Sequence, residues 1–181
     1  SISFGFGNPS ESGSWGVREN QFDYYILRGS EEMCSLPKAY LGGRVHYLLN
    51  IVAALASIYP FNSAAEFESI ESFEGLRHRF EVVSEVNGVR FINDSKATNV
   101  SATEAALRNF ESKEQVILIL GGDAKGVDLS ILEMSISKKV FGLVILALDP
   151  APLLELGSRC GIETFATSSM EEAVKEAYRL V

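Results

Sequence analysis

The second half of the chain alternates all-apolar runs with helical segments, and this alternation constrains the fold more than any other feature. The runs at 116–120 and 140–148 are mainly aliphatic, and a shorter run follows at 162–165. Strands without polar alternation are buried on both faces, as in parallel sheets. Helical patterns accompany them at 101–110, 129–138, 152–159 and 169–181. The sequence therefore predicts a Rossmann-like, doubly wound, mostly parallel α/β domain.

Turn and cap signals mark the ends of these elements. Asn87-Gly88 lies between two strand-like runs and is a strong β-hairpin signal. Two capping boxes, Ser101-Ala-Thr-Glu104 and Ser169-Met-Glu-Glu172, predict helix starts, and Gly161 predicts a helix end. The chain ends inside its last predicted helix, so we expect this domain to lack its final segment.

The first 40 residues have a different texture. They are rich in Gly, Ser, Asn and aromatic residues, and only 22–27 resembles a strand. Their apolar periodicity is too weak for an independent domain. We expect Trp15 and the other early aromatic residues to pack in a core or against a sheet.

A helical pattern follows, with apolar residues at three- and four-residue spacing over 42–59 and a stop at Pro60. A shorter helix is predicted at 63–69. We therefore expect an incomplete α/β piece over 1–74, followed by the Rossmann-like domain over 75–181.

Overall composition argues against several classes of function. The net charge of −8 opposes phosphate-backbone binding, which needs clustered Lys and Arg. The longest strongly apolar stretch, 46–61, is shorter than the roughly 20 residues that a membrane helix needs. Residues 1–6 do not resemble a signal peptide. We expect a cytoplasmic protein that binds neither nucleic acid nor membrane.

The cysteines and histidines are few, and they argue against a disulfide and against a metal site. Cys34 and Cys160 are far apart and form no CxxC pair, so we expect reduced thiols. His46 and His78 are the only histidines, which argues against a zinc site. No nucleophile–base pair is evident. We expect no metal site and no catalytic residue in this chain.

A polar loop at 93–99 precedes the predicted helix at 101–110. It combines a carboxylate, an ammonium, two hydroxyls and two amides. A helix N-terminus favours an anion, Lys96 adds a positive charge, and Asp94 is suited to accept hydrogen bonds from ribose hydroxyls. A solvated turn with an N-cap is the commoner outcome for such a composition, so composition leaves both interpretations open.

Three further positions are candidates for ligand contacts. Lys125 follows glycines in the loop 121–126, which matches neither a Walker A loop nor GxGxxG; an ordinary strand-to-helix turn is an equal alternative. Arg79 suits a phosphate clamp, against a plain surface arginine. His46 and Asn50 share one helix face, either for a ligand or as a polar stripe at a domain interface.

Several segments occur together in a distinctive order: GLRHRFE at 75–81, NGVRFINDSKATNVSATEAAL at 87–107 and LGGDAK at 120–125. A helix with the pattern HxxxNxxAA precedes them, from His46 onward. In order and spacing these segments resemble the Mur ligase family, and within it the branch that adds D-glutamate. The resemblance is clear over 41–129 and looser to the C-terminus, and NDSKATN is its most specific part.

The resemblance implies an ADP-forming acid–amino-acid ligase of peptidoglycan synthesis, and so of cell-wall growth, cell shape and division. Its substrates would be ATP with Mg²⁺, UDP-N-acetylmuramoyl-L-alanine and D-glutamate, joined through an acyl phosphate by a cytoplasmic monomer. By matching positions, Asn50, Arg79 and Asp94 would contact ATP. The D-glutamate carboxylates would be bound by Lys96, Thr98 and Lys125.

The chain also departs from the family pattern. Tyr47 stands where the family has an asparagine, and the P-loop, the Mg²⁺ ligands and the modified lysine of the central ATPase domain are not in this sequence. We therefore expect no ATP turnover by the chain alone. Two alternatives are a ligase for another amino acid, which the NDSKATN loop disfavours, and a non-catalytic nucleotide-binding Rossmann-like module.

Overall fold

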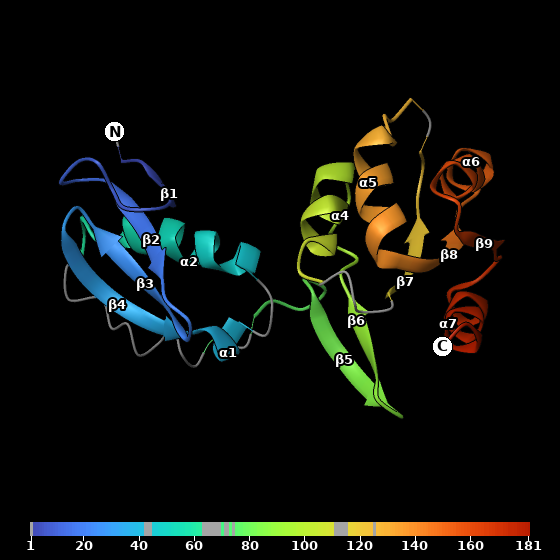
Figure 1. The fold of residues 1–181 in the computed structure, drawn as a ribbon, viewed down its shortest axis with the longest axis horizontal. Coiled ribbons are helices and arrows are strands. Elements are labelled where there is room, and N and C mark those ends of the chain that lie inside the picture. The colour runs from blue at the N-terminus through green and yellow to red at the C-terminus, as the bar shows by residue number, and fades with distance from the viewer. Residues whose placement is uncertain are drawn as a thin grey trace. The chain divides into compact units, whose positions relative to one another are not determined.

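The computed structural model describes residues 2–41, 45–62, 70, 73, 75–110, 116–124 and 126–181 (Figure 1). Contacts divide the chain into two units, Ser1–Leu76 and Arg77–Val181. The helix predicted at 63–69 lies outside the described residues. The first unit's identity as part of an ATP-binding domain stays a prediction.

The first unit contains a four-stranded sheet in the order β1-β2-β3-β4. Its strands are β1 (Phe4–Phe6), β2 (Trp15–Glu19), β3 (Asp23–Arg28) and β4 (Glu31–Pro37). β1 runs parallel to β2, and the other neighbours are antiparallel. Only β3 corresponds to a predicted strand. The expectation of a single strand was wrong because β2 and β4 contain charged residues that hide the apolar pattern.

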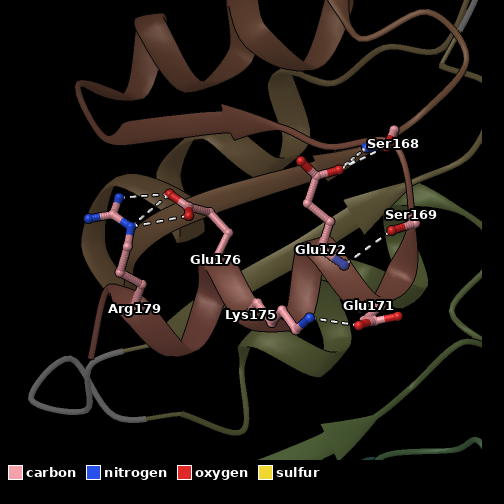
Figure 2. A pocket seen from close by; sticks show the side chains of 7 residues that line it. All are labelled: Ser168, Ser169, Glu171, Glu172, Lys175, Glu176 and Arg179. Atoms are coloured by element: carbon pink, nitrogen blue, oxygen red, sulfur yellow. Dashed lines mark hydrogen bonds and ion pairs between the residues drawn. The ribbon is translucent and has the colours of Figure 1, made fainter.

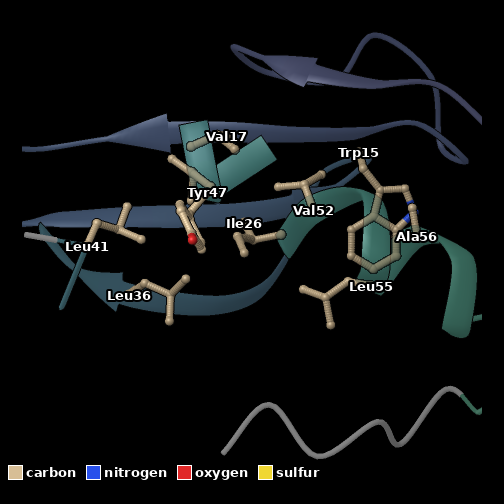
Figure 3. Close-up of a cluster of buried hydrophobic side chains, with 10 residues drawn as sticks. Trp15, Val17, Ile26, Leu36, Leu41, Tyr47, Val52, Leu55 and Ala56 are labelled. Carbon is tan, nitrogen blue, oxygen red and sulfur yellow. The ribbon is translucent and has the colours of Figure 1, made fainter. Parts of the chain in front are cut away.

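Two helices follow, α1 (Lys38–Leu41) and α2 (Val45–Ile58), and α2 packs against β1 and β2. Figure 3 shows the core between helix and sheet, where Trp15, Ile26 and Val52 are buried. The core position predicted for Trp15 is confirmed.

The same prediction is confirmed for Tyr24, which packs against this core, but it was wrong for three phenylalanines. Phe4, Phe6 and Phe22 are exposed. β1 is a three-residue edge strand, and Phe22 precedes β3 in a turn closed by Asn20. Phe4 and Phe6 lie on the same face of β1, since alternate strand residues point the same way, and both rings are exposed on that face.

The second unit begins with a hairpin, β5 (Glu81–Val86) and β6 (Val89–Asn93). Its two turn residues, Asn87 and Gly88, have φ of 53° and 80°, which a two-residue turn of this kind requires. The predicted hairpin is confirmed. At its tip, Asn87 Nδ2 donates to Tyr178 Oη at 2.9 Å, and the rings of Phe91 and Tyr178 stack with centroids 6.0 Å apart.

A parallel sheet in the order β7-β8-β9 follows, made of β7 (Val116–Gly121), β8 (Val140–Leu146) and β9 (Glu163–Ala166). Its helices are α4 (Val100–Leu107), α5 (Ser130–Lys139), α6 (Ala151–Cys160) and α7 (Met170–Arg179). The predicted alternation and the α/β class are confirmed. No helix among the described residues is long and apolar enough to cross a membrane.

Helices cover both faces of this sheet. On β8, Leu143 is fully buried in a cluster with Ile136 of α5 and Leu156 of α6. The preceding Gly142 points to the other face, where Leu180, just after α7, lies over it. Neighbouring strand residues point to opposite faces, so β8 is buried from both sides (Figure 1). β7 and β9 are only partly buried, so the expectation of strands buried on both faces is confirmed for β8 alone.

One predicted helix start was wrong. The N-cap of α4 is Asn99, whose Oδ1 accepts from Ala102 N at 2.8 Å. Ser101 lies inside the helix, and Glu104 pairs with Arg108 at 3.2 Å. Asparagine is among the best N-caps, and it comes first where the chain leaves the extended loop. The predicted start of α7 is confirmed, because its Ser169 side chain accepts from Glu172 N.

Candidate functional site

The connection from β6 to α4, residues 93–99, is a compact turn held by its own hydrogen bonds. Asn93 Oδ1 accepts from Ser95 N at 3.1 Å. Asp94 O accepts from Ala97 N at 2.8 Å. The polar residues of this loop therefore lie on an ordered support beside the start of α4.

A second segment, just before β5, is hydrogen-bonded to this loop at three points. The carbonyl of His78 accepts from Lys96 N at 3.1 Å. Asp94 Oδ1 accepts from Phe80 N at 3.0 Å. Asn93 Nδ2 lies 2.9 Å from His78 Nδ1. Backbone and side-chain contacts together bind the two segments to each other.

The backbone of this second segment adopts an unusual conformation. His78 and Phe80 have φ of 65° and 48°, a left-handed region that costs a non-glycine residue about 1–3 kcal/mol. Phe80 is buried, with its ring centroid 5.5 Å from that of Phe110. Arg79 lies between these two anchored residues, and its side chain is exposed. These two residues fix the backbone position of Arg79, from which its guanidinium extends into solvent.

The charges of this region favour an anionic ligand. Arg79, Lys96 and Thr98 are exposed, and Lys96 and Thr98 lie just before the N-terminus of α4. Within the described residues, the Lys96 ammonium makes no hydrogen bond or ion pair. A guanidinium, an ammonium and a helix N-terminus together attract phosphate or carboxylate groups. Asp94 is half-buried and uses one carboxylate oxygen on the Phe80 N–H.

Magnesium is not suited to these residues. The loop offers one carboxylate, Asp94, which is already hydrogen-bonded to the Phe80 N–H next to Arg79 and lies two positions before Lys96. Mg²⁺ prefers oxygen ligands in an octahedral set. The part of the chain that the structure describes contains no cluster of three or more His, Cys, Asp or Glu residues able to hold a metal ion.

The loop after β7 lies at the carboxyl end of the parallel sheet, where open α/β folds bind ligands. Gly121 pairs with Leu146 of β8, and a Cβ at Gly121 would overlap the Leu146 carbonyl. Glycine is therefore required for the close approach of the two strands. Lys125 lies outside the described residues, so its predicted contact with a ligand stays a prediction.

Asn50 lies on α2 in the first unit, where its side chain is exposed. The side chain of His46, the other candidate on that helix, is outside the described residues. The structure thus gathers four of the predicted site residues on two hydrogen-bonded segments of the second unit: Arg79, Asp94, Lys96 and Thr98. The roles of all the predicted residues stay predictions.

Sequence reasoning gave no role to His78 or Asn93. The two side chains contact each other at 2.9 Å across fifteen positions of the chain. The available signal was their place beside Arg79 and Asp94 in the segments with the family resemblance. Their contact depends on the left-handed φ of His78. No glycine or turn motif at this position predicts that conformation from the sequence.

A shallow hollow along α7 is a different feature (Figure 2). It is lined by Ser168, Ser169, Glu171, Glu172, Lys175, Glu176 and Arg179. Its charges are paired within the helix: Lys175 Nζ lies 2.6 Å from Glu171, and Arg179 Nη2 lies 2.7 Å from Glu176. The hydrogen bond from Arg179 lowers the pKa of Glu176. These side chains satisfy one another, so the hollow has no features of a ligand site.

Both the second unit and the chain as a whole are similar to known proteins. A family model described as Mur ligase, glutamate ligase domain matches residues 78–181. Two relatives carry the name UDP-N-acetylmuramoylalanine–D-glutamate ligase. The one from Nitrosomonas eutropha is 33% identical and covers 99% of this chain. The one from Nitrosococcus oceani is 37% identical and covers 97%. The chain spans 38% and 39% of those relatives' own lengths.

The fold is also found in a solved structure. The UDP-N-acetylmuramate–alanine ligase MurC from Thermotoga maritima matches 94% of this chain with a TM-score of 0.67. The identity is 14%, and the match covers 40% of that protein. At this identity the likeness concerns the fold alone.

Proposed function

Because the chain belongs to the Mur ligase family, we propose that it forms part of the ATP-binding and D-glutamate-binding surface of a peptidoglycan-precursor ligase. The substrates are ATP, UDP-N-acetylmuramoyl-L-alanine and D-glutamate. The observation that carries the proposal is the hydrogen-bonded pair of segments holding Arg79 beside the loop 93–99. This arrangement offers several anion-binding groups from one rigid support.

The reaction proceeds in two steps. The γ-phosphoryl group of ATP passes to the carboxylate of UDP-N-acetylmuramoyl-L-alanine, which gives an acyl phosphate and ADP. The amine of D-glutamate then attacks the acyl carbon, phosphate leaves, and the amine proton passes to solvent. Such transfers depend mainly on positioning and on neutralising phosphate charge, which are tasks for cations and hydrogen-bond donors.

For the nucleotide, Arg79 neutralises phosphate charge, because its planar guanidinium suits bidentate contacts. Asp94 accepts hydrogen bonds from the ribose hydroxyls with the carboxylate oxygen that does not bind the Phe80 N–H. Asn50 contributes a further ATP contact from the first unit. Magnesium accompanies ATP, and its ligands belong to parts of the family's central domain that do not occur in this sequence.

For the amino acid, Lys96, Thr98 and Lys125 bind the two carboxylates of D-glutamate. Lys96 supplies a point charge and Thr98 a hydroxyl donor at the start of α4, where the helix dipole adds to the attraction. We further propose a cytoplasmic monomer, and a chain that is inactive by itself because it has no P-loop.

Phosphate release by the native gene product tests the proposal. The assay contains ATP, Mg²⁺ and UDP-N-acetylmuramoyl-L-alanine, with and without D-glutamate. We expect release that requires D-glutamate, and L-glutamate serves as the control for specificity. Nucleotide binding without D-glutamate-dependent release would instead support the non-catalytic module. ADP formation by the 181-residue chain alone would overturn its predicted inactivity.

A further inference from the structure

His78 is anchored through almost all of its polar groups. Its backbone N–H donates to Glu81 Oε2 at 2.7 Å, and its carbonyl accepts from Lys96 N at 3.1 Å. Its ring Nδ1 lies 2.9 Å from Asn93 Nδ2. Within the described residues, the other ring nitrogen, Nε2, makes no hydrogen bond, and 48% of the side chain is exposed. Residues held in a strained backbone conformation, as His78 is, cluster at functional sites.

The tautomer of the ring follows from the hydrogen bonds of Asn93. The Asn93 carbonyl oxygen accepts from Ser95 N at 3.1 Å, and this contact sets which way the amide points. The amide nitrogen therefore faces His78 and donates to Nδ1. A ring nitrogen that accepts a hydrogen bond carries no proton, so in the neutral ring the proton is on Nε2.

One nearby group favours the opposite arrangement. Glu81 Oε2 lies 3.9 Å from His78 Nδ1 and would attract a proton there. In that state two donors, Nδ1–H and the Asn93 amide, would face each other. Relieving this clash by turning the amide over would remove the acceptor of Ser95 N–H. Asn93 thus opposes the effect of the carboxylate on the ring.

We propose that Asn93 is a positioning residue that holds the His78 imidazole in its Nε2–H tautomer, so that the ring presents one neutral N–H donor beside Arg79. The ligand that accepts this hydrogen bond is the phosphate-bearing nucleotide. This assignment rests on the proposed function. A neutral donor orients an anion without adding charge, and it complements the charged guanidinium next to it in the chain. The positioning acts through the contact of Asn93 Nδ2 with His78 Nδ1 and the hydrogen bond that Asn93 Oδ1 accepts from Ser95 N.

The tautomer is directly measurable, because the sequence contains only two histidines, His46 and His78. Long-range ¹H–¹⁵N NMR spectra of the neutral rings distinguish a protonated from an unprotonated nitrogen. The variant His46→Gln assigns the signals. We expect His78 of the unmutated chain to carry its proton on Nε2. A ring with its proton mainly on Nδ1 would overturn the proposal without the need for any variant.

Asn93→Asp changes the partner of the ring from a donor to an acceptor. We expect the proton to move to Nδ1, where it meets the new carboxylate. Asn87→Asp is the matched control: Asn87 also donates from its Nδ2 to another side chain, Tyr178, but it lies in the turn that precedes β6. It should leave the His78 signals unchanged. An unaltered His78 tautomer in Asn93→Asp would contradict the positioning role.

A kinetic measurement links the tautomer to the ligand. In the native gene product, we expect Asn93→Asp to raise KM for ATP by about tenfold, as the loss of one ligand hydrogen bond implies, with Asn87→Asp near the unmutated value. Equal KM values for the two variants would contradict the role of the donor. If the native protein shows no D-glutamate-dependent phosphate release, the proposed function fails, and the NMR result alone then supports or overturns the role of Asn93.

Discussion

Arg79 owes its exposed position to the residues on either side of it. His78 and Phe80 are both in the left-handed region and both bonded to the loop that follows β6. Lysine at this position would keep the charge but lose the planar fork that grips a phosphate group with two hydrogen bonds. The shape of the side chain therefore matters as much as its charge.

We predict that Arg79→Lys lowers kcat/KM of the native gene product by about 10- to 100-fold, because one hydrogen bond to a charged phosphate group is lost. Steady-state kinetics with varied ATP measures this. Arg18→Lys is the matched control, since Arg18 is an exposed arginine on β2 that pairs with Glu32. Equal activities of the two variants would contradict the proposed role of Arg79 in binding ATP.

A carboxylate at the start of α7 gives the fold a dependence on pH. Glu172 Oε2 accepts from Ser168 N and Ser168 Oγ, both at 2.8 Å. These hydrogen bonds, the backbone one first, lower the pKa of Glu172. A lowered pKa in the folded state stabilises the protein above the unfolded pKa of about 4.3, and this contribution is lost as pH falls through the folded value.

We therefore predict that Glu172→Gln is less stable than the unmutated chain at neutral pH, and that the difference shrinks below about pH 4. Thermal unfolding at pH 7 and pH 3 measures it. Glu171→Gln controls for the loss of a negative charge in the same first turn, where Glu171 pairs with Lys175. A difference between Glu172→Gln and the unmutated chain that grows on acidification would contradict this account.

Among the secondary-structure elements, α4 most directly supports the candidate site. Its start is determined by Asn99, and the capping box predicted from Ser101 and Glu104 does not form. Both positions carry residue types that cap helices. The choice between them depends on where the extended chain after β6 turns into the helix, and this is a property of the loop contacts and not of the helix sequence.

We predict that Asn99→Ala lowers the free energy of unfolding by about 1 kcal/mol, as the loss of an N-cap does. Ser101→Ala should change it by less than about 0.5 kcal/mol, because alanine is the better residue inside a helix. Urea unfolding followed by circular dichroism compares the two variants. A larger loss of unfolding free energy for Ser101→Ala than for Asn99→Ala would mean that the predicted capping box does form.

The elements that could be predicted are those whose sequence patterns lie within a few neighbouring residues. The hairpin at Asn87-Gly88 and the aliphatic strands β7 and β8 were predictable because turn chemistry and continuous aliphatic runs lie within a few residues. β2, with sequence WGVRE, has no such pattern. It becomes a strand through pairing with β1 and β3, and pairing partners are not visible in a short window of sequence.

The candidate site was predictable to a similar extent. The loop at 93–99 was identified from its composition and its resemblance to a family, and the structure binds it to the segment carrying Arg79. The side-chain contact between Asn93 and His78 was not predictable, because it depends on a backbone conformation that is rare outside glycine.

For the whole molecule, the two units have separate cores. One buried cluster includes Trp15, Ile26 and Leu48 of the first unit, and the other includes Leu143 and Leu156 of the second. Each cluster draws its members from one unit only. We therefore expect the two units to unfold in separate transitions.

The single tryptophan makes this expectation testable, because Trp15 reports on the first unit alone. Circular dichroism reports on the helices of both units. We predict that Asn99→Ala shifts part of the circular-dichroism transition to lower urea concentration and leaves the Trp15 fluorescence midpoint unchanged. Parallel titrations of both signals measure this. A common shift of both midpoints would mean that the units unfold as one cooperative body.

The contact between Asn87 and Tyr178 joins positions 91 residues apart in the chain. During translation the hairpin β5–β6 leaves the ribosome long before α7, and Phe91 has no Tyr178 ring to stack on until α7 has emerged. The loop that carries Lys96 and Thr98 begins where this hairpin ends. A nascent chain that ends before residue 170 therefore lacks the ring that stacks on Phe91 and the hydroxyl that accepts from Asn87.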